Sequence, residues 1–424
     1  MKILVVGSGG REHALIRKLK QSPRTQELYC CPGNGGIAAD ATCVDISAMD
    51  IPGVTAFCLE KGIDLAVVAP DDPLAAGMVD ALNEKGIMTF GPTQAAAQIE
   101  ASKVFSKNLM KEFGIPTAAC EVFDDPAKAE AYIREKNQFP TVIKADGLAL
   151  GKGVIIAQDL EEARAGLHEI MEDKVFGASG NRVVVEEFLT GPEVSVLAFV
   201  DGKTVVPMVS SMDHKRALDG DKGLNTGGMG TIAPNPFYTE EIARQCMDTI
   251  FRPTVDAMAK LGRPFKGCLY FGLMLTPKGP QVIEYNSRFG DPETQVVLEL
   301  LESDLVDIME AVYRGTLTPE MVRFAPGAAA CVILASGGYP KSYRKGLPIS
   351  GLDANGQAEG VSVYHSGTKL SDGQYLSNGG RVLGVTARAE DLPSALEKAY
   401  TAVDGISFEG CFCRRDIGHR ALEK

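Results

Sequence analysis

The chain of 424 residues contains no tryptophan, no CxxC pair, and no cysteine–histidine group with the spacing of a zinc site. A cofactor stacked on an indole ring is therefore excluded. The ten cysteines, which include the neighbours Cys30 and Cys31, are expected to be reduced and mostly buried. The alternative is a metal or redox site around Cys411 and Cys413.

Long apolar runs and an excess of basic residues are also missing. The opening MKILVVGSGG is typical of a strand and a turn, and it is too short for a signal peptide or a membrane span. With 43 Lys and Arg against 55 Asp and Glu, the formal net charge is −12, which argues against nucleic acid as a partner. These absences predict a cytoplasmic protein without membrane contact. Phosphate ligands would then need glycine loops, a few basic side chains or a metal ion.

The order of apolar runs predicts a multidomain α/β protein. Residues 1–102 alternate short apolar runs such as Ile3–Val6 with helical stretches, which predicts an N-terminal parallel sheet covered on both faces. Residues 103–325 mix strands and helices, which predicts an α+β region. Residues 326–424 alternate short strands with glycine-rich turns and predict a small β-rich domain.

The segment IEYNSRFGDPETQ, from Ile283 to Gln295, carries the strongest chemical signal. Glu284 and Asn286 are two apart on a predicted strand, so both face one side and offer the hard oxygens that Mg²⁺ takes. Arg288 follows on the same face if the strand continues, where it could hold a carboxylate or phosphate. A turn then opens a helix expected over Asp291–Tyr313. The alternative is a polar strand end with an ordinary helix cap.

The segment IKADGLALGKGV predicts a loop that covers phosphate groups. Lys144 ends a strand, and Gly147, Gly151 and Gly153 let the backbone approach phosphate oxygens, with Lys152 as a second point charge. The pattern differs from a P-loop, because no hydroxyl follows the lysine and a strand follows the loop. A purely structural glycine hairpin is the alternative.

The segment VVVEEFLTGPEVSV places acids beside an apolar strand. Glu186 and Glu187 end the strand and Glu193 follows a Gly-Pro turn. Two acids near an apolar slot could receive the amino group of adenine and the hydroxyls of ribose. A solvated strand end is the alternative.

The N-terminal GSGGREHA is only a partial dinucleotide fingerprint. Gly7 and Gly9 match its start, but Glu12 stands where the third glycine belongs, and no acid follows a second strand at the usual distance. The helix start at Gly10 and Arg11 still suits a phosphate group. His13 is expected to pack the helix.

The segment MDHKRALDGDKGLNTGGMG combines mixed charges with glycines. Asp213 and Lys215 precede a stretch, Asp219–Gly230, that contains five glycines and also Lys222 and Asn225. This composition suggests a mobile loop that contacts a small polar substrate. A disordered surface loop is the alternative.

Together these strings, with PGNGG and GPTQAAAQIEASK, resemble the phosphoribosylamine–glycine ligase (glycinamide ribonucleotide synthetase) family of the ATP-grasp superfamily. The resemblance covers nearly the whole chain. It implies a pre-ATP-grasp N-terminal domain, a two-lobed ATP-grasp domain over 103–325 with a mobile lid subdomain at about 122–190, and a C-terminal domain. It also implies a carbon–nitrogen ligase of purine biosynthesis that joins glycine to 5-phosphoribosylamine with ATP as co-substrate and Mg²⁺ or Mn²⁺ as cofactor. A monomer that works on small molecules is expected.

The resemblance also implies residue roles. ATP would contact Lys103, Lys144, Gly147, Gly151, Lys152, Gly153, Glu186, Glu187, Leu189 and Glu193. Substrates would contact Gly9, Gly10, Arg11, Asn34, Gly35, Asp213, Lys222, Asn225, Arg288, Gly290, Asp291 and Pro292. Arg288, Asp213 and Lys215 would act in catalysis, and Glu284 and Asn286 would hold the metal. One departure from the superfamily is that the preceding strand, Cys268–Thr276, has no acid, which leaves a second protein-held metal open.

The implied chemistry needs no covalent nucleophile from the protein. Phosphoryl transfer to the glycine carboxylate would give a glycyl phosphate, which the ribosylamine nitrogen could attack while a closed loop excludes water. Three rivals remain at this point. They are an ATP-grasp ligase for another acid and amine, a nucleotide-binding oxidoreductase or sensor, and a non-catalytic binding protein.

Overall fold

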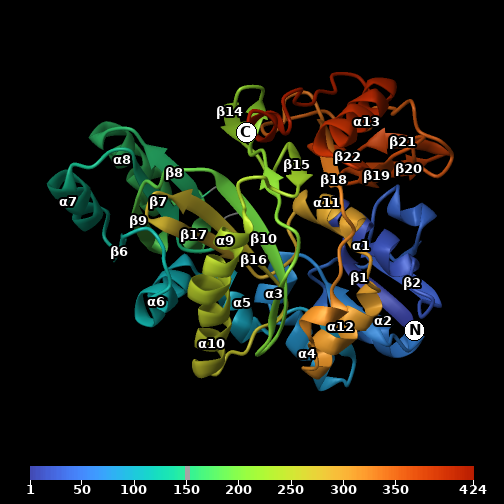
Figure 1. Ribbon diagram of the computed structural model, residues 1–424, viewed down its shortest axis with the longest axis horizontal. Coiled ribbons are helices and arrows are strands. Elements are labelled where there is room, and N and C mark those ends of the chain that lie inside the picture. Colours follow the sequence, from blue (N-terminus) through green and yellow to red (C-terminus); the bar gives the residue numbers. More distant parts are fainter. Residues whose placement is uncertain (149–152) are drawn as a thin grey trace.

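The N-terminal region forms a five-stranded parallel sheet, as predicted. The computed structural model describes residues 1–148 and 153–424 (Figure 1). The strand order is β3-β2-β1-β4-β5, and all neighbours are parallel. The strands are β1 (Lys2–Gly7), β2 (Glu27–Pro32), β3 (Thr42–Cys43), β4 (Leu65–Val68) and β5 (Met88–Phe90). The helices are α1 (Gly10–Lys20), α2 (Ile51–Lys61), α3 (Asp71–Ala75), α4 (Met78–Glu84) and α5 (Gln94–Ala101), with a short 3₁₀ turn η1 (Ile37–Ala39).

Alternation along β1 explains why this sheet is covered on both faces. Ile3 and Val5 point to one side and pack with α1, whereas Leu4 and Val6 point to the other and pack with α2 and α4. Successive side chains of a strand leave on opposite faces, so a continuous apolar run demands cover on each.

The middle region contains two antiparallel sheets, which correspond to the two predicted lobes. The first sheet has the order β6-β9-β7-β8, and the second has the order β11-β10-β16-β17. The first comprises β6 (Cys120–Phe123), β9 (Val183–Glu187), β7 (Thr141–Ala145) and β8 (Val154–Ala157). The second comprises β11 (Val205–Pro207), β10 (Glu193–Asp201), β16 (Lys266–Thr276) and β17 (Gly279–Asn286).

Helices cover each of these sheets. The first sheet packs on α7 (Pro126–Lys136) and α8 (Leu160–Leu167), followed by η3 (His168–Glu172) and η4 (Gly177–Asn181). The second packs on α6 (Lys103–Phe113), α9 (Glu240–Cys246) and α10 (Arg252–Lys260). Asp125 caps α7, because its carboxylate accepts from the backbone N–H of Ala127 at 2.8 Å, and Pro126 at the first position needs no acceptor for an N–H group. A π-helical segment, η5 (Met247–Phe251), connects α9 to α10.

Two sequence-based predictions in this part of the chain are wrong. The helix predicted over Asp291–Tyr313 is two helices, α11 (Glu293–Leu300) and α12 (Leu305–Arg314), because Asp304 caps the second through the N–H of Val306 at 2.9 Å. The predicted loop at Asp219–Gly230 largely forms a hairpin of β13 (Arg216–Leu218) and β14 (Lys222–Asn225) and the strand β15 (Gly230–Ala233). The ion pair between Arg414 and Asp221 at 2.8 Å ties the hairpin to the C-terminal segment.

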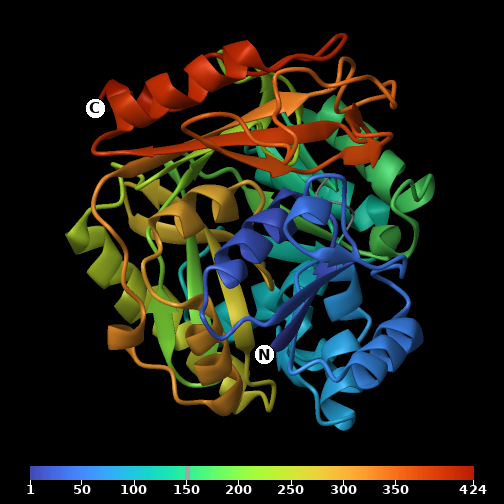
Figure 2. The same ribbon diagram turned by 90° about the vertical axis from the view of Figure 1, so that its right-hand side faces the viewer.

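The C-terminal region is β-rich, as predicted, and it shares its sheet with earlier strands. The order is β12-β15-β18-β22-β19, where β12 is Met212–Asp213. The remaining elements are η6 (Pro319–Met321), β18 (Ala328–Ala335), β19 (Ser362–His365), β20 (Thr368–Ser371), β21 (Gln374–Ser377), β22 (Arg381–Ala389), α13 (Leu392–Gly405) and α14 (His419–Leu422). Figure 2 shows this sheet and α13 lying across the N-terminal and middle regions, where α1 contacts both β19 and α11.

No helix in the part of the chain that the structure describes combines the length and the apolar character needed to cross a membrane.

Candidate active site

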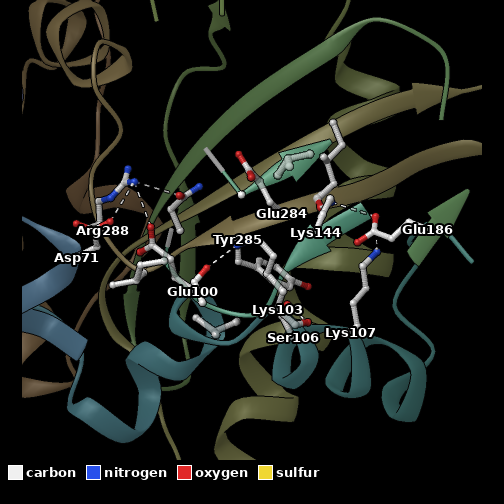
Figure 3. A pocket seen from close by; sticks show the side chains of 17 residues that line it. Asp71, Glu100, Lys103, Ser106, Lys107, Lys144, Glu186, Glu284, Tyr285 and Arg288 are labelled. Carbon is white, nitrogen blue, oxygen red and sulfur yellow. Dashed lines mark hydrogen bonds and ion pairs between the residues drawn. The ribbon is translucent and has the colours of Figure 1, made fainter. Parts of the chain in front are cut away.

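A polar pocket lies where the first antiparallel sheet, β17, α5 and α6 meet (Figure 3). The side chains around it come from regions far apart in the sequence. Its lining residues are Asp71, Ile99, Glu100, Lys103, Ser106, Lys107, Lys144, Gly147, Leu148, Gly153, Val154, Glu186, Ile283, Glu284, Tyr285, Asn286 and Arg288. Eight of the predicted site residues are in this set: Lys103, Lys144, Gly147, Gly153, Glu186, Glu284, Asn286 and Arg288.

One side of the pocket is built on a buried carboxylate held between two lysines. Antiparallel pairing of β7 with β9 brings Lys144 and Glu186 together, and α6 supplies Lys107 from below. The Glu186 side chain is only 4% exposed, and its Oε2 atom lies 3.0 Å from Lys144 Nζ and 3.2 Å from Lys107 Nζ. Burial lowers the pKa of Lys107, and the Glu186 carboxylate opposes this shift.

The second carboxylate oxygen of Glu186 lacks a partner among the described residues. Its Oε1 atom is buried without a hydrogen bond, whereas Oε2 takes both lysines. A buried acceptor left unpaired costs free energy unless a ligand or water supplies the donor. This oxygen therefore marks a place for a ligand N–H group.

Lys103 stands at the opening of α6 and contacts the glycine-rich turn. Its Nζ atom donates to the carbonyl of Gly147 at 2.6 Å, and burial lowers its pKa. The adjacent Asp146 carboxylate accepts from Ser102 Oγ at 2.9 Å and from the N–H of Val104 at 3.1 Å, so it caps α6. The other two lid residues named from the sequence, Gly151 and Lys152, lie outside the described residues.

Glu284 and Asn286 lie at the C-terminal end of β17, where this strand pairs with β16. Their partners on β16 are Gly272 and Tyr270, so the two side chains share one face of the sheet. Although burial opposes it, the lysines Lys215, Lys144 and Lys103 lower the pKa of Glu284 and favour its charged form. Over the described ranges, no three His, Cys, Asp or Glu side chains gather as a metal site. A metal ion at Glu284 and Asn286 would need further oxygen ligands from a bound phosphate or from water.

Arg288 follows the end of β17 and turns back toward Asn286. Its Nη2 atom lies 3.1 Å from Asn286 Oδ1, 3.1 Å from Glu100 Oε1 and 4.0 Å from Asp71 Oδ2. Its buried Nε atom has no partner among the described residues. Burial works against the charge, but the carboxylates of Glu100 and Asp71 raise the pKa of Arg288.

A second group of predicted residues lies beside Glu284. Lys215 Nζ is 3.4 Å from a Glu193 oxygen and 3.9 Å from a Glu284 oxygen, so these three side chains meet. Asp213 Oδ1 accepts from the N–H of His214 at 2.8 Å. Burial and the nearby Glu293 raise the pKa of Asp213 well above its usual range.

The predicted glycines of the N-terminal helix lie against the turn after β17. Arg11 Nη1 donates to the carbonyl of Phe289 at 3.1 Å, and a Cβ added at Gly9 would lie 3.4 Å from Asp291 Oδ2. At Gly10 an added Cβ would come within 2.7 Å of Gln295 Nε2. Gly9, Gly10, Arg11, Gly290, Asp291 and Pro292 are therefore brought to one place.

Other predicted residues are used differently or lie apart. Asn34 Nδ2 donates to the carbonyls of Ser8 and His365, and Gly35 N–H donates to Thr368, so both tie the N-terminal region to the C-terminal one. Glu187 accepts from the N–H of Ala119 at 3.2 Å. Glu187, Leu189 and Glu193 are outside the set that lines the pocket, and Lys222 and Asn225 are exposed on β14. Their ligand roles stay predictions.

Several residues at the site were missed from the sequence. Lys107 had a usable signal, since it lies one helical turn after Lys103 on α6. Asp71 follows the buried strand β4 at its carboxyl end, a usual ligand position in parallel sheets. Glu100 contacts Arg288, and Arg381 contacts Asp291 at 3.3 Å. Neither residue had a local signal, because its partner is distant in the sequence.

Comparisons with known proteins agree with this arrangement. Models of the phosphoribosylglycinamide synthetase N domain, ATP-grasp (A) domain and C domain match residues 1–100, 101–294 and 329–420. The chain is 47% identical to phosphoribosylamine–glycine ligase of Rhodopirellula baltica over 426 residues, which cover 99% of this chain and 98% of that protein.

Solved structures extend the comparison to the fold. The crystal structure of phosphoribosylamine–glycine ligase from Thermotoga maritima matches with a TM-score of 0.86 at 34% identity, covering 98% of this chain and all of that one (100%). The biotin carboxylase domain of 2-oxoglutarate carboxylase from Hydrogenobacter thermophilus, solved with MgADP, ADP and bicarbonate, matches at 0.73. Its identity is 17% and the match covers 97% of this chain and 91% of that one, so it shows the fold alone. The three-part architecture predicted from the sequence is confirmed, and the chain belongs to the phosphoribosylglycinamide synthetase family.

Proposed function

We propose that this chain joins glycine to 5-phosphoribosylamine at the expense of ATP, giving glycinamide ribonucleotide, ADP and phosphate in purine biosynthesis. The relatives named phosphoribosylamine–glycine ligase support this assignment across the whole chain. The observation that carries it is the pocket in which Lys103 and Lys144 face Glu284 and Asn286. Cations for phosphates and oxygens for a metal meet there, as phosphoryl transfer to a carboxylate requires.

The nucleotide would occupy the pocket with its base beside Glu186. The unpaired Oε1 atom of Glu186 would accept from the adenine amino group, and Lys103 and Lys144 would contact the phosphates. Gly147 and Gly153 flank the segment that would cover them, with Gly151 and Lys152 within it. We keep Glu187, Leu189 and Glu193 as the proposed contacts to the rest of the nucleoside.

A divalent cation, Mg²⁺ or Mn²⁺, fits the oxygens at the end of β17. One carboxylate and one amide oxygen, from Glu284 and Asn286, are hard ligands, and Mg²⁺ in such sites completes its shell with water and phosphate oxygens. Strand β16 offers no acid, so any second ion would depend on phosphates. When bound, the cation would neutralise phosphate charge and polarise the transferred group.

The reaction then needs two displacements with no covalent protein nucleophile. A glycine carboxylate oxygen attacks the γ-phosphorus of ATP, the bond to the ADP oxygen breaks, and glycyl phosphate forms. The amine of phosphoribosylamine next attacks the glycyl carbonyl carbon, phosphate leaves, and the nitrogen loses a proton. Arg288, Asp213 and Lys215 would orient the glycine and the amine and offset the developing charge.

The ribosylamine would bind where α1 meets the turn after β17. Gly9 caps a helix that Gly10 and Arg11 open, and its N-terminus favours a phosphate group. Asn34 lies close by, because its Nδ2 atom donates to the carbonyl of Ser8 at 2.8 Å, and Gly35 follows it. The remaining contacts that we propose are Lys222, Asn225, Gly290, Asp291 and Pro292.

We propose the domain division 1–102, 103–325 with a lid at about 122–190, and 326–424.

We also propose a monomer in the cytoplasm that works on small molecules without nucleic acid or membrane partners. Ten free thiols are consistent with a reducing compartment. Sedimentation at the mass of one chain, 45.1 kDa, is the expected result for a monomer, and a sedimenting dimer would refute it.

ADP release is the direct test of the reaction. It is measured with ATP, Mg²⁺, glycine and phosphoribosylamine generated in situ, and then with each component omitted in turn. Release should require both glycine and the amine, and the product should contain both. Release that requires a different acid or amine would instead assign the chain to another ATP-grasp ligase activity.

A further inference from the structure

A carboxylate from the N-terminal region, Glu100, reaches the pocket and holds the segment that follows β17. Glu100 lies in the last turn of α5, and its side chain is 8% exposed. Its Oε2 atom accepts from the N–H and the hydroxyl of Ser287 at 2.8 and 2.9 Å. Its Oε1 atom lies 3.1 Å from Arg288 Nη2 (Figure 3). One buried side chain therefore fixes two consecutive residues of the loop.

The guanidinium of Arg288 divides its donors between protein and pocket. Nη2 is taken by Glu100 Oε1 and by Asn286 Oδ1, both at 3.1 Å, while Nη1 reaches the carbonyl of Phe289 at 3.3 Å. Nε is buried and has no partner in the described part of the chain. Because the group is rigid and planar, fixing Nη2 also fixes the direction in which Nε–H points.

Arg288 is the cation in direct contact with the Glu100 carboxylate, and Lys103 feels its charge only from farther away. A neutral glutamine could accept from Ser287 through its amide oxygen at little cost, so the Ser287 contacts alone do not call for a carboxylate. Burying a carboxylate is unfavourable unless a cation compensates it, and Arg288 is the nearest cation. Asp71, at 4.0 Å from the same nitrogen, is a weaker second anchor.

We propose that Glu100 is a positioning residue that aims Arg288 at the substrate and, through Arg288, fixes the metal-ligand oxygen of Asn286. The proposal deepens the function assigned above and rests on it for the identity of the substrates. It also assigns the N-terminal region a part in catalysis beyond binding the ribosylamine, because the Glu100 carboxylate fixes the orientation of the Arg288 and Asn286 side chains in the pocket.

The first experiment is a double-mutant cycle on ADP release. Glu100→Gln keeps the side-chain volume and an acceptor for Ser287, so it should fold while kcat/KM falls by about 10- to 100-fold, the usual effect of a displacement near 1 Å. In an Arg288→Ala background, the same substitution should change kcat/KM less than about twofold, because its route of action is gone. Glu84→Gln, an exposed carboxylate on α4, is the matched control and should retain wild-type turnover.

The second experiment measures binding without turnover. Calorimetry compares the affinity for ADP with and without Mg²⁺ in wild type, Glu100→Gln and Glu100→Asp. The glutamine variant should lose the Mg²⁺-dependent gain in affinity while its metal-free affinity for ADP does not fall, and the aspartate variant should recover part of the gain.

Two results would overturn the positioning role. One is an equal fold-loss from Glu100→Gln in the wild-type and Arg288→Ala backgrounds, and the other is an unchanged Mg²⁺-dependent gain in the glutamine variant. A wild-type chain that releases no ADP with glycine and phosphoribosylamine would instead sink the proposed reaction. The binding experiment would still decide the role of Glu100 in that case, since it needs neither substrate.

Discussion

Replacing Glu186 by glutamine should strongly destabilise the ligand-free protein, because the carboxylate compensates two buried lysines. The contacts to Lys144 and Lys107, at 3.0 and 3.2 Å, correspond to roughly 5 kcal/mol each at an effective dielectric constant of about 20. Desolvation offsets much of this attraction. Removing one partner of a buried ion pair still costs about 3–5 kcal/mol, because the other charge stays buried and uncompensated.

The loss of stability in Glu186→Gln should depend on pH because of Lys107. Burial lowers the pKa of Lys107 in the folded state, so the unfolded chain binds more protons than the folded one between the two pKa values. Stability therefore rises with pH across that interval. Loss of Glu186 removes the interaction that raises this pKa, so the rise should begin at a lower pH in the variant. Part of the lost stability should return between pH 7 and 10.

Urea unfolding followed by circular dichroism at pH 7 and pH 10 measures both effects. Glu187→Gln is the matched control, since the neighbouring carboxylate is exposed and accepts one backbone N–H. The double variant Glu186→Gln, Lys107→Met should be more stable than Glu186→Gln alone, because it removes one of the two stranded charges. A loss below about 1 kcal/mol for Glu186→Gln at pH 7, the range of an exposed pair, would refute the reasoning.

Three further predictions follow from other parts of the molecule. Glu284→Ala should stay folded and lose turnover by at least about 100-fold through loss of the metal, and near-normal ADP release would contradict that role. Burial lowers the pKa of His13, of His214 to about 4 and of His365 to about 3, so stability should fall as pH drops below 6.5. His214 and His365 alone give a slope of up to roughly 2.7 kcal/mol per pH unit, because each contributes about 1.36 kcal/mol while it is charged only in the unfolded chain, and a flat urea midpoint from pH 7 to 5 would be inconsistent with it. Gly191→Ala should lower the unfolding midpoint, because its φ is +150° and the added Cβ would lie 2.1 Å from the carbonyl of Leu275; an unchanged midpoint would exclude that clash.

Where local signals were complete, the sequence predicted the elements that carry the site. The strands expected on either side of the glycine-rich segment form as β7 and β8. The strand expected to carry Glu284 and Asn286 forms as β17, and their spacing of two residues places both side chains on one face. The phosphate-binding role of Lys103 was implied by the family resemblance and not by a local pattern.

Contacts between distant segments could not be read in the same way. Glu100 meets Ser287 across 187 positions in the sequence, and nothing in either local pattern indicates the pairing. The break between α11 and α12 was missed although the residues between the two helices are mostly polar and Asp304 is a recognisable cap. The hairpin of β13 and β14 was predicted as part of a loop, because its glycines are typical of loops. The contact of Arg414 with Asp221, which stabilises the hairpin, comes from nearly 200 positions away in the sequence.

Charge balance in the pocket explains why a metal is central to the proposed reaction. The chain carries a net charge of −12, so its overall field repels a nucleotide. Among the described residues, the charged side chains that line the pocket are four cations and four anions: Lys103, Lys107, Lys144, Arg288, Asp71, Glu100, Glu186 and Glu284. Three of the four cations are within 4 Å of a carboxylate, whereas Lys103 contacts a backbone carbonyl.

A pocket with balanced charges offers a polyphosphate little net attraction. A divalent cation at Glu284 and Asn286 would supply the two positive charges that the protein does not, at the point where the γ-phosphate must meet the glycine carboxylate. Lys107, Lys144 and Arg288 then orient the substrates more than they attract them, because their carboxylate partners fix where each N–H group points. This division of roles is why loss of Glu100 should weaken the Mg²⁺-dependent part of nucleotide affinity without lowering the metal-free part.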